Sequence, residues 1–270
     1  MKKNLILFSI CFCFQFTYSQ ISNIIPASTS IAETSVSDTR NWTAFHNPSM
    51  LGYLEKKELG INYNNRFIIP ELSTKSIQLG LSSNLINTGF SFSHFGYSQY
   101  HEIMIGLGFA RNFADKFAMG LQFNYLTCYF AASNSYRGAL LPQIGLSVKI
   151  SPVLNIGFNV NNPFQTNLKT EYSVKRIPSV FSLGTKYDFS PELVWRLQMD
   201  KEISSNYRFA SGFEYSMLKS VSIKLGAYGS DYFVPCIGVG LNAGIFIFNL
   251  NCELHPILGI NTSAAIKYHF

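Results

Sequence analysis

From Lys57 to the last residue, apolar side chains alternate with small or polar ones along extended stretches of the chain. Successive side chains of a β-strand point to opposite faces of a sheet, so this period of two predicts strands. Short turns or longer polar segments separate the stretches. We predict fourteen strands, with twelve as the competing number, at residues 57–67, 74–84, 87–96, 101–112, 117–130, 139–150, 153–161, 179–189, 193–202, 206–217, 220–229, 233–242, 245–255 and 258–270.

The two faces of these stretches favour a membrane barrel over a water-soluble sheet. Along 101–112, bulky apolar residues on one face oppose small or uncharged residues on the other. A soluble sandwich would bury its bulky faces and expose a charged face, whereas lipid against the bulky face removes the need for charge there. We therefore predict an all-β fold, a single transmembrane antiparallel β-barrel of about 14 strands with an N-terminal plug segment. A secreted β-sandwich is the alternative.

Charged residues of the C-terminal half fall on the small, polar face, which would line the lumen of such a barrel. In four consecutive predicted strands they alternate with bulky apolar residues; the set is Lys186, Asp188, Arg196, Asp200, Arg208, Glu214 and Lys224. A charge on the lipid face would cost roughly 2–4 kcal/mol at the bilayer midplane, so the lumen is the favourable side. We predict a cluster of paired charges there and favour a bracing role over contact with a substrate.

The first 19 residues have the features of an export signal. Lys2 and Lys3 precede an apolar run, and Thr17 and Ser19 are the small residues that a cleavage site requires. We predict that residues 1–19 are removed on export.

Residues 20–56 are rich in Ser and Thr and lack the strand alternation. We predict that this N-terminal plug segment packs inside or under the barrel formed by residues 57–270. It contains an Asn-Pro turn, because the residue before a proline is disfavoured in a helix. In this hypothesis the turn seats the plug and helps to define an apolar pocket, with the plug residues Phe45, Asn47, Pro48, Met50 and Leu51. A plain turn leading into the first strand is the alternative.

The composition agrees with a membrane barrel and disfavours other classes. Charged residues are 13% of the 270 residues, about half the usual quarter, and aromatic residues are 15%. Such a chain can bury ample apolar surface, which excludes disorder, but it has too few charges for the surface of a typical cytosolic enzyme. The formal net charge of +6 is scattered along the chain, so we expect no nucleic-acid partner.

Residue types that carry chemistry show no pattern typical of a catalytic, metal or cofactor site. The five histidines are scattered, without the spacing of metal ligands. Serines lie near His94 and His101, but no G-x-S-x-G elbow occurs. The cysteines after the signal are odd in number, which argues against a disulfide framework and leaves at most one bridge among Cys128, Cys236 and Cys252. We predict no catalytic residue, metal or cofactor, and therefore not an enzyme.

The C-terminal residues carry a separate signal. Ile266, Tyr268 and Phe270 lie on one face of the last predicted strand, and the chain ends on the aromatic ring. This pattern resembles the signal that the outer-membrane assembly machinery recognises. Together with the export signal it predicts a place in the outer membrane of a Gram-negative cell, with outer-membrane lipid and the barrel-assembly machinery as partners.

The segment from Ser35 to Gly52, with Asp38, Asn47 and Pro48, resembles the N-terminal D-x-x-x-x-x-x-N-P-A-x-L segment of FadL-like outer-membrane barrels, although eight residues separate Asp38 from Asn47 where that pattern has six. Ser49 stands where that family usually has Ala. Stretches of the C-terminal half resemble the final strands of the family, most closely of its PorV/PorQ-type branch from bacteria with type IX secretion; they are 208–215, 222–228, 238–241 and 255–259. The resemblance implies a fourteen-stranded barrel plugged by its N-terminal segment.

The resemblance implies two kinds of function. FadL members import long-chain fatty acids or other hydrophobic compounds, whereas PorV and PorQ members dock secreted cargo or surface proteins. We expect a docking or accessory role of the type IX secretion kind, with secretion-system or surface proteins as partners. The polar connector 162–178 is the candidate partner surface. Passive transport of a small hydrophobic compound across the outer membrane is the alternative, and a secreted β-sandwich adhesin is the second alternative.

Overall fold

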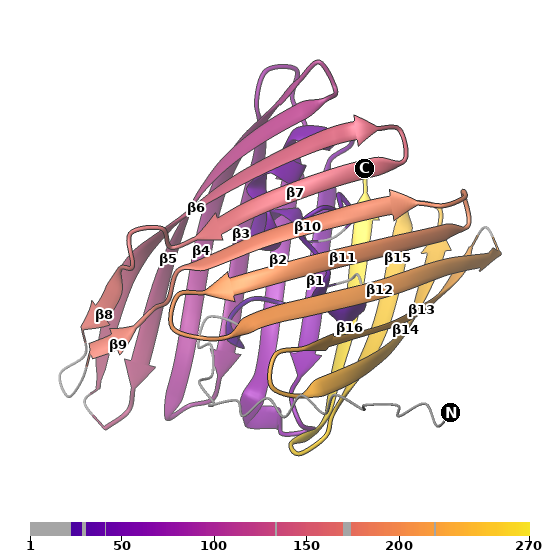
Figure 1. Cartoon of the computed structure of the whole chain (residues 1–270). Coiled ribbons are helices and arrows are strands. Elements are labelled where there is room, and N and C mark those ends of the chain that lie inside the picture. Colours follow the sequence, from indigo (N-terminus) through magenta and orange to yellow (C-terminus); the bar gives the residue numbers. More distant parts are fainter. Residues whose placement is uncertain (1–22, 29–30, 41, 133, 170–173, 219) are drawn as a thin grey trace, which may run out of the picture.

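Fourteen antiparallel strands close into one barrel, in which β1 (Glu58–Asn65) pairs with β16 (Gly259–His269) (Figure 1). The structure is a computed structural model that describes residues 23–28, 31–40, 42–132, 134–169, 174–218 and 220–270. The predicted export signal at 1–19 lies outside the described residues. Closure of the sheet confirms the predicted barrel and favours fourteen strands over twelve. The sandwich alternative is wrong, because the barrel sheet is one closed layer.

The strands follow one another around the barrel in chain order, apart from a short excursion after β7. Between β1 and β16 they are β2 (Ser73–Leu81), β3 (Asn87–Gly96), β4 (Tyr100–Phe113), β5 (Phe117–Phe130), β6 (Ser135–Ser151), β7 (Leu154–Asn161), β10 (Val180–Asp188), β11 (Leu193–Glu202), β12 (Tyr207–Leu218), β13 (Val221–Gly229), β14 (Phe233–Ala243) and β15 (Phe246–His255). The excursion is a separate hairpin of β8 (Asn167–Lys169) and β9 (Val174–Arg176). It lies inside the segment that the sequence predicted to be a polar connector.

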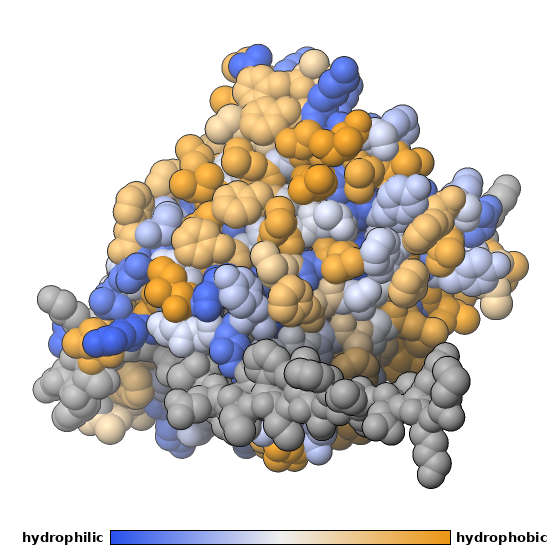
Figure 2. All heavy atoms as spheres, viewed as in Figure 1, coloured by the Kyte–Doolittle hydropathy of each residue, from blue (hydrophilic) through white to orange (hydrophobic). Residues whose placement is uncertain are grey.

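The outer face of the wall is apolar, as the alternation predicts. Along β4 and β5 the exposed residues are bulky, such as Leu107 and Leu121, while their neighbours Gly106 and Gln122 are buried. Acidic residues of the described barrel strands all lie at inward positions. Figure 2 shows apolar side chains over much of one side of the wall. A surface of this kind suits hydrocarbon, because lipid-facing charge is costly.

Helices contribute little to the architecture. Among the described residues, no helix is long and apolar enough to cross a membrane. One short 3-10 turn, η4 (Pro70–Leu72), connects β1 to β2. The remaining helical turns belong to the plug.

The wall is taller on one side than on the other. β6 pairs with β5 from Ser135 onward, but its pairing with β7 begins only at Gln143. The loop-side half of β6 therefore extends beyond the ends of β7 and β10. The β8–β9 hairpin lies beside this step in the wall (Figure 1).

The N-terminal segment lies inside the barrel. Its helical turns are η2 (Ile31–Glu33), α1 (Thr43–His46) and η3 (Pro48–Tyr53), and most of its described residues are buried. The segment enters beside Ser93 and Thr74 near the loop end of the barrel. It leaves at the opposite end and leads into β1.

Glycines on the inner wall give the plug its space. A Cβ atom at Gly120 would overlap the backbone of Pro48, and one at Gly145 would overlap the side chain of Asn47. Gly60 makes room in the same way for the ring of Trp42. The small inward residues that the sequence shows thus allow the wall and plug backbones to approach closely.

Replacing Gly120 with Val should displace the plug without preventing barrel closure, because position 120 faces inward and the new side chain would overlap Pro48. Gly184→Ala is the matched control, since its Cβ would lie 3.4 Å from its nearest neighbour, the carbonyl oxygen of Leu197. Conductance in planar bilayers should rise for Gly120→Val alone. Equal conductance of the two variants would contradict the close fit between plug and wall.

Candidate functional site

The inner wall binds the plug backbone through amide side chains. The Gln198 Oε1 atom accepts hydrogen bonds from the backbone N–H groups of Ser35, at 2.7 Å, and Val36, at 3.1 Å. On the other side of the lumen, Gln122 Nε2 donates to the carbonyl oxygen of Ala44 at 2.5 Å. Gln143, Asn155 and Asn251 donate to plug carbonyls in the same way. Buried backbone groups require partners, and here the wall supplies them.

Asn47 organises the turn in the middle of the plug. Its Nδ2 donates to the carbonyl oxygen of Val36 at 2.6 Å, which ties two parts of the plug together. Its Oδ1 accepts from the backbone N–H of Ser49 at 3.1 Å and from the Ser49 hydroxyl at 2.8 Å. This is the N-cap arrangement of η3, with Pro48 at the first helical position.

A buried ionic group joins the plug to the wall. The Arg196 guanidinium on β11 lies 2.6 Å from Asp38 Oδ2 of the plug and 2.8 Å from Glu214 Oε2 on β12. Arg40 of the plug also approaches Glu214, at 3.4 Å. The sequence predicted Arg196 and Glu214 for the lumen, but Asp38, which completes the group, was not among the predicted charges. Its position in the N-terminal motif was the signal that could have identified it.

The other predicted lumen charges also point inward but form separate groups. Arg208 donates to Asp200, with the Nε to Oδ2 distance at 2.8 Å, and to plug carbonyls at Ala32 and Glu33. Lys186 pairs with Asp188 at 2.8 Å on the same strand. The remaining member, Lys224, donates to Asn249. The sequence predicted one cluster of charges, whereas the structure shows several separate networks, two of which contact the plug.

A further ion pair lies where the barrel closes. Lys267 on β16 lies 3.5 Å from Glu58 on β1, and both side chains are buried. The Lys267 ammonium also lies 5.4 Å from the centre of the Trp42 ring. The sequence prediction missed this pair, because its two residues lie at opposite ends of the strand order.

Burial and nearby charges shift the pKa values of titratable groups in the plug. Burial opposes ionisation of Asp38, but the guanidinium groups of Arg196 and Arg40 outweigh it and hold its pKa well below the usual value. Burial lowers the pKa of His46 to about 4. Burial and the nearby Glu253 carboxylate raise the pKa of Glu33 to about 8.

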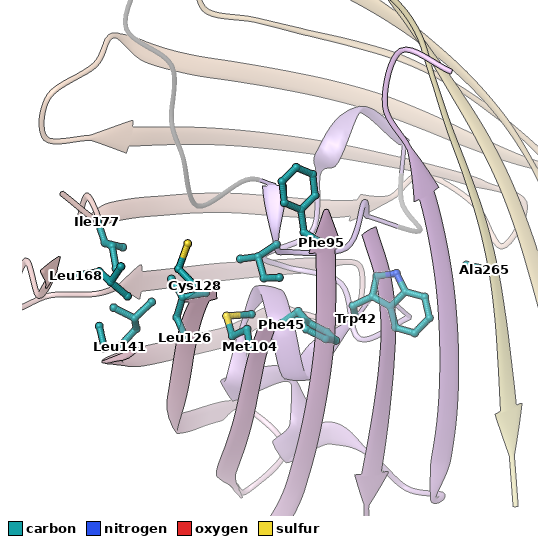
Figure 3. Packing of buried hydrophobic residues seen from close by; sticks show 12 residues of the cluster. Trp42, Phe45, Phe95, Met104, Leu126, Cys128, Leu141, Leu168, Ile177 and Ala265 are labelled. Carbon is teal, nitrogen blue, oxygen red and sulfur yellow. The ribbon is translucent and has the colours of Figure 1, made fainter. Parts of the chain in front are cut away.

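An apolar cluster fills the loop-side part of the lumen (Figure 3). We call it the inner apolar cluster. The plug contributes Ile24, Trp42 and Phe45, and the hairpin segment contributes Leu168 and Ile177. The inward faces of five barrel strands supply the rest, namely Phe95, Met104, Leu126, Cys128, Ala139, Leu141 and Ala265. An apolar patch of this size contrasts with the polar inner wall elsewhere.

The structure does not bring all the predicted plug residues into one pocket. Phe45 belongs to the inner apolar cluster, whereas Leu51 packs in another group with Ala44 and Ala110. Met50 is fully buried but lies in neither group.

Two polar cavities lie at the turn end of the barrel. The larger has a volume of about 440 Å³ and is lined by charged side chains such as Lys149, Lys186 and Asp188. The smaller, of about 120 Å³, lies beside Asp38, Arg40 and Glu214. The plug therefore separates polar cavities on one side from the inner apolar cluster on the other.

The predicted assembly residues lie outside the lumen. Ile266 and Phe270 are exposed on the outer face, and the Tyr268 and Phe270 rings stack with centroids 5.4 Å apart. The cysteines Cys128, Cys236 and Cys252 are free thiols. Within the described part of the chain, no three His, Cys, Asp or Glu side chains are placed to hold a metal ion.

No protein-family model matches the chain, and no curated protein matches it in sequence. Solved structures resemble it in fold. The CymD monoaromatic hydrocarbon channel has a TM-score of 0.68 at 10% identity, covering 94% of this chain and 99% of its own. The P. putida toluene transporter TodX has a TM-score of 0.66 at 10% identity, with 92% and 99% covered. A Pseudomonas aeruginosa FadL homologue has a TM-score of 0.64 at 11% identity, and the match covers 92% of this chain and 100% of that one. The fold is that of a FadL-like barrel.

The expected docking role in type IX secretion is wrong. Two of the solved structures named above are a monoaromatic hydrocarbon channel and a toluene transporter, which match the stated alternative, and none of the three supports the PorV/PorQ-type branch. Among the described residues of the candidate partner surface at 162–178, Leu168 and Ile177 are buried in the inner apolar cluster, so these two side chains are not available to a docked protein.

Replacing Arg196 with Met should lower the free energy of unfolding by about 3–5 kcal/mol, because Asp38 and Glu214 would keep buried charges without their shared partner. Lys186→Met is the control, with an expected loss below about 1 kcal/mol because its ion pair is partly exposed. Urea unfolding of the barrel in lipid vesicles measures both. Equal losses would show that Arg196 does not fasten the plug.

Stability should also depend on pH through His46. Its pKa is about 4 in the folded protein and near 6.5 when unfolded, so the unfolded chain binds more protons between these values. This contribution to stability is therefore lost as the pH falls from about 6.5 to 4. Glu33 acts in the opposite sense between about 8 and 4.5, so only the difference between wild type and His46→Gln is diagnostic.

Unfolding midpoints at pH 7, 5.5 and 4.5 measure that difference. We expect wild type to lose more stability than His46→Gln on acidification. Parallel pH profiles would show that the histidine is not buried in its neutral form.

Proposed function

We propose that this protein is an outer-membrane channel for a small hydrophobic compound. The observation that carries the proposal is the inner apolar cluster, which offers apolar contacts inside a wall that is otherwise polar on its inner face. Ligand sites for apolar compounds are lined mainly by such side chains. Two proteins with the same fold, a monoaromatic hydrocarbon channel and a toluene transporter, support a solute of that class.

In this proposal the plug blocks passage through the lumen, and the β8–β9 hairpin segment covers the inner apolar cluster on its loop side. Leu168 and Ile177 close the inner apolar cluster toward the loops, while Trp42 and Phe45 close it toward the plug. A solute that enters from the loop side replaces contacts of the hairpin residues with its own. Passage then requires the part of the plug around α1 to shift.

The remaining parts of the chain take supporting roles. We propose that residues 1–19 direct export and that Ile266, Tyr268 and Phe270 direct assembly into the outer membrane. The lumen charges at Arg196 and Arg208 hold the plug through Asp38 and plug carbonyls. Outer-membrane lipid surrounds the wall, and two proteins with the same fold are named as a channel and a transporter, which fits this proposal.

Leu141 and Leu140 provide a test with adjacent residues. Leu141 is 1% exposed inside the inner apolar cluster, whereas Leu140 is 49% exposed on the outer face. Leu141→Gln should weaken binding of toluene about ten-fold or more, since a buried amide without partners disfavours an apolar ligand. Leu140→Gln should leave binding unchanged.

Trp42 can report the binding, because the chain has only two tryptophans. In a Trp195→Phe background, toluene should change the emission of Trp42 in wild type and in Leu140→Gln at equal concentrations. Uptake of labelled toluene by cells that express each variant gives the transport readout. Equal binding and uptake for Leu141→Gln and Leu140→Gln would overturn the proposal.

A further inference from the structure

Groups that can carry positive charge are rare on the outer face of the described barrel strands. They are Lys75, His94, His101, Arg111 and Lys201. None of the acidic residues of these strands shares that face. Any anionic partner of these groups must therefore come from outside the barrel strands, for example from the membrane.

Three of these groups lie together near the loop end of the wall. Lys75 on β2 is directly opposite His94 on β3. The rings of His94 and His101, on β4, stack with centroids 5.5 Å apart. Lys75 is exposed and has no acidic partner among the described residues. Their close approach places one lysine charge and two imidazole rings side by side on the outer face.

Two tyrosines extend the group across the next strands. The Tyr129 ring on β5 stacks on His101 with centroids 4.8 Å apart. Tyr136 on β6 lies beside both, and its hydroxyl is 3.4 Å from His101 Nε2. The five side chains thus form one row over five adjacent strands, which we call the loop-end row.

The position of the loop-end row points to a lipid. On the same strands, the outward residues nearer the middle of the wall are Ile77, Phe92 and Ile103. These apolar side chains suit acyl chains, and the row lies where the headgroup of the same lipid would be. A lysine ammonium donates strong hydrogen bonds to phosphate oxygens, an imidazole N–H can donate to them as well, and basic side chains at this depth attract anionic headgroups.

We propose that the loop-end row binds the phosphate of an outer-leaflet lipid headgroup. The lipid's acyl chains lie along β2–β4, and its phosphate lies between Lys75 and the two histidines. The Tyr136 hydroxyl is placed to donate a further hydrogen bond. This site is on the outside of the wall and is independent of the solute path proposed above.

Lys201 offers a matched control on the other side of the barrel. It also lies outward near the loop end, but its ammonium donates to the Ser205 carbonyl oxygen at 2.6 Å and lies 4.7 Å from the centre of the Tyr207 ring. One of its three donors is therefore already engaged, and its charge lies beside an aromatic ring. No histidine accompanies it on the neighbouring strands β10 and β12.

The test uses the full-length barrel in detergent micelles, with lipid A carrying two phosphates and lipid A carrying one as probes. Native mass spectrometry measures the lipid retained. The triple variant Lys75→Gln, His94→Gln, His101→Gln should retain diphosphorylated lipid A about ten-fold more weakly than wild type, and Lys75→Gln alone about five-fold more weakly. Lys201→Gln should behave as wild type, and monophosphorylated lipid A should bind wild type less tightly.

Three outcomes would overturn the proposal. They are equal retention by the triple variant and wild type, equal loss in Lys201→Gln, and displacement of the lipid by inorganic phosphate at the same concentration. Heat-modifiable migration in gels confirms that each variant is folded, and Lys75→Gln changes only an exposed side chain. Toluene binding by the same variants should be unchanged, which separates this site from the proposed channel function.

Discussion

An apolar exterior forces the polar groups of this chain to find partners inside the barrel. Every acidic residue of the described barrel strands points inward, and several of them are buried because the plug occupies much of the lumen. The plug in turn has little regular structure, so its backbone needs hydrogen bonds that helices and sheets would otherwise provide. Amides such as Gln198 and Gln122, and ions such as Arg196, meet both needs together.

This arrangement explains why the residues that face the lumen are both small and polar. Small residues such as Gly120 allow the plug to touch the wall backbone, and the amides beside them hold it there. The same composition could line an open pore. The buried contacts of Asn47 and Trp42 with wall glycines show that here it accommodates a tightly packed segment.

The alternation of apolar and polar residues was sufficient to predict the strands and their faces. Each strand residue faces either the lipid outside or the plug inside, so its side chain type indicates its side. Features that depend on contacts distant in sequence were not predictable in this way. The β8–β9 hairpin follows a polar stretch, and only the step beside β6 explains why Leu168 is buried. Likewise, the N-terminal motif contains Asp38, but only the folded structure shows that Arg196 is its partner. The closest resemblance of the motifs also led to the wrong function, because fold is shared more widely than function.

The plug is held unequally on its two sides, and this bears on how a channel could open. Ionic contacts fasten the part near Asp38 to β11 and β12. The part at α1 is held by uncharged contacts, namely apolar packing of Phe45 and hydrogen bonds from Gln122 and Gln143. Apolar contacts are non-directional, so a hydrophobic solute can replace them at little cost. The ionic contacts offer no such exchange, because an apolar molecule cannot replace a charge. In the proposed channel, α1 is therefore the part of the plug that a solute would displace, with the loss of its hydrogen bonds to Gln122 and Gln143, while Asp38 stays bound to the wall.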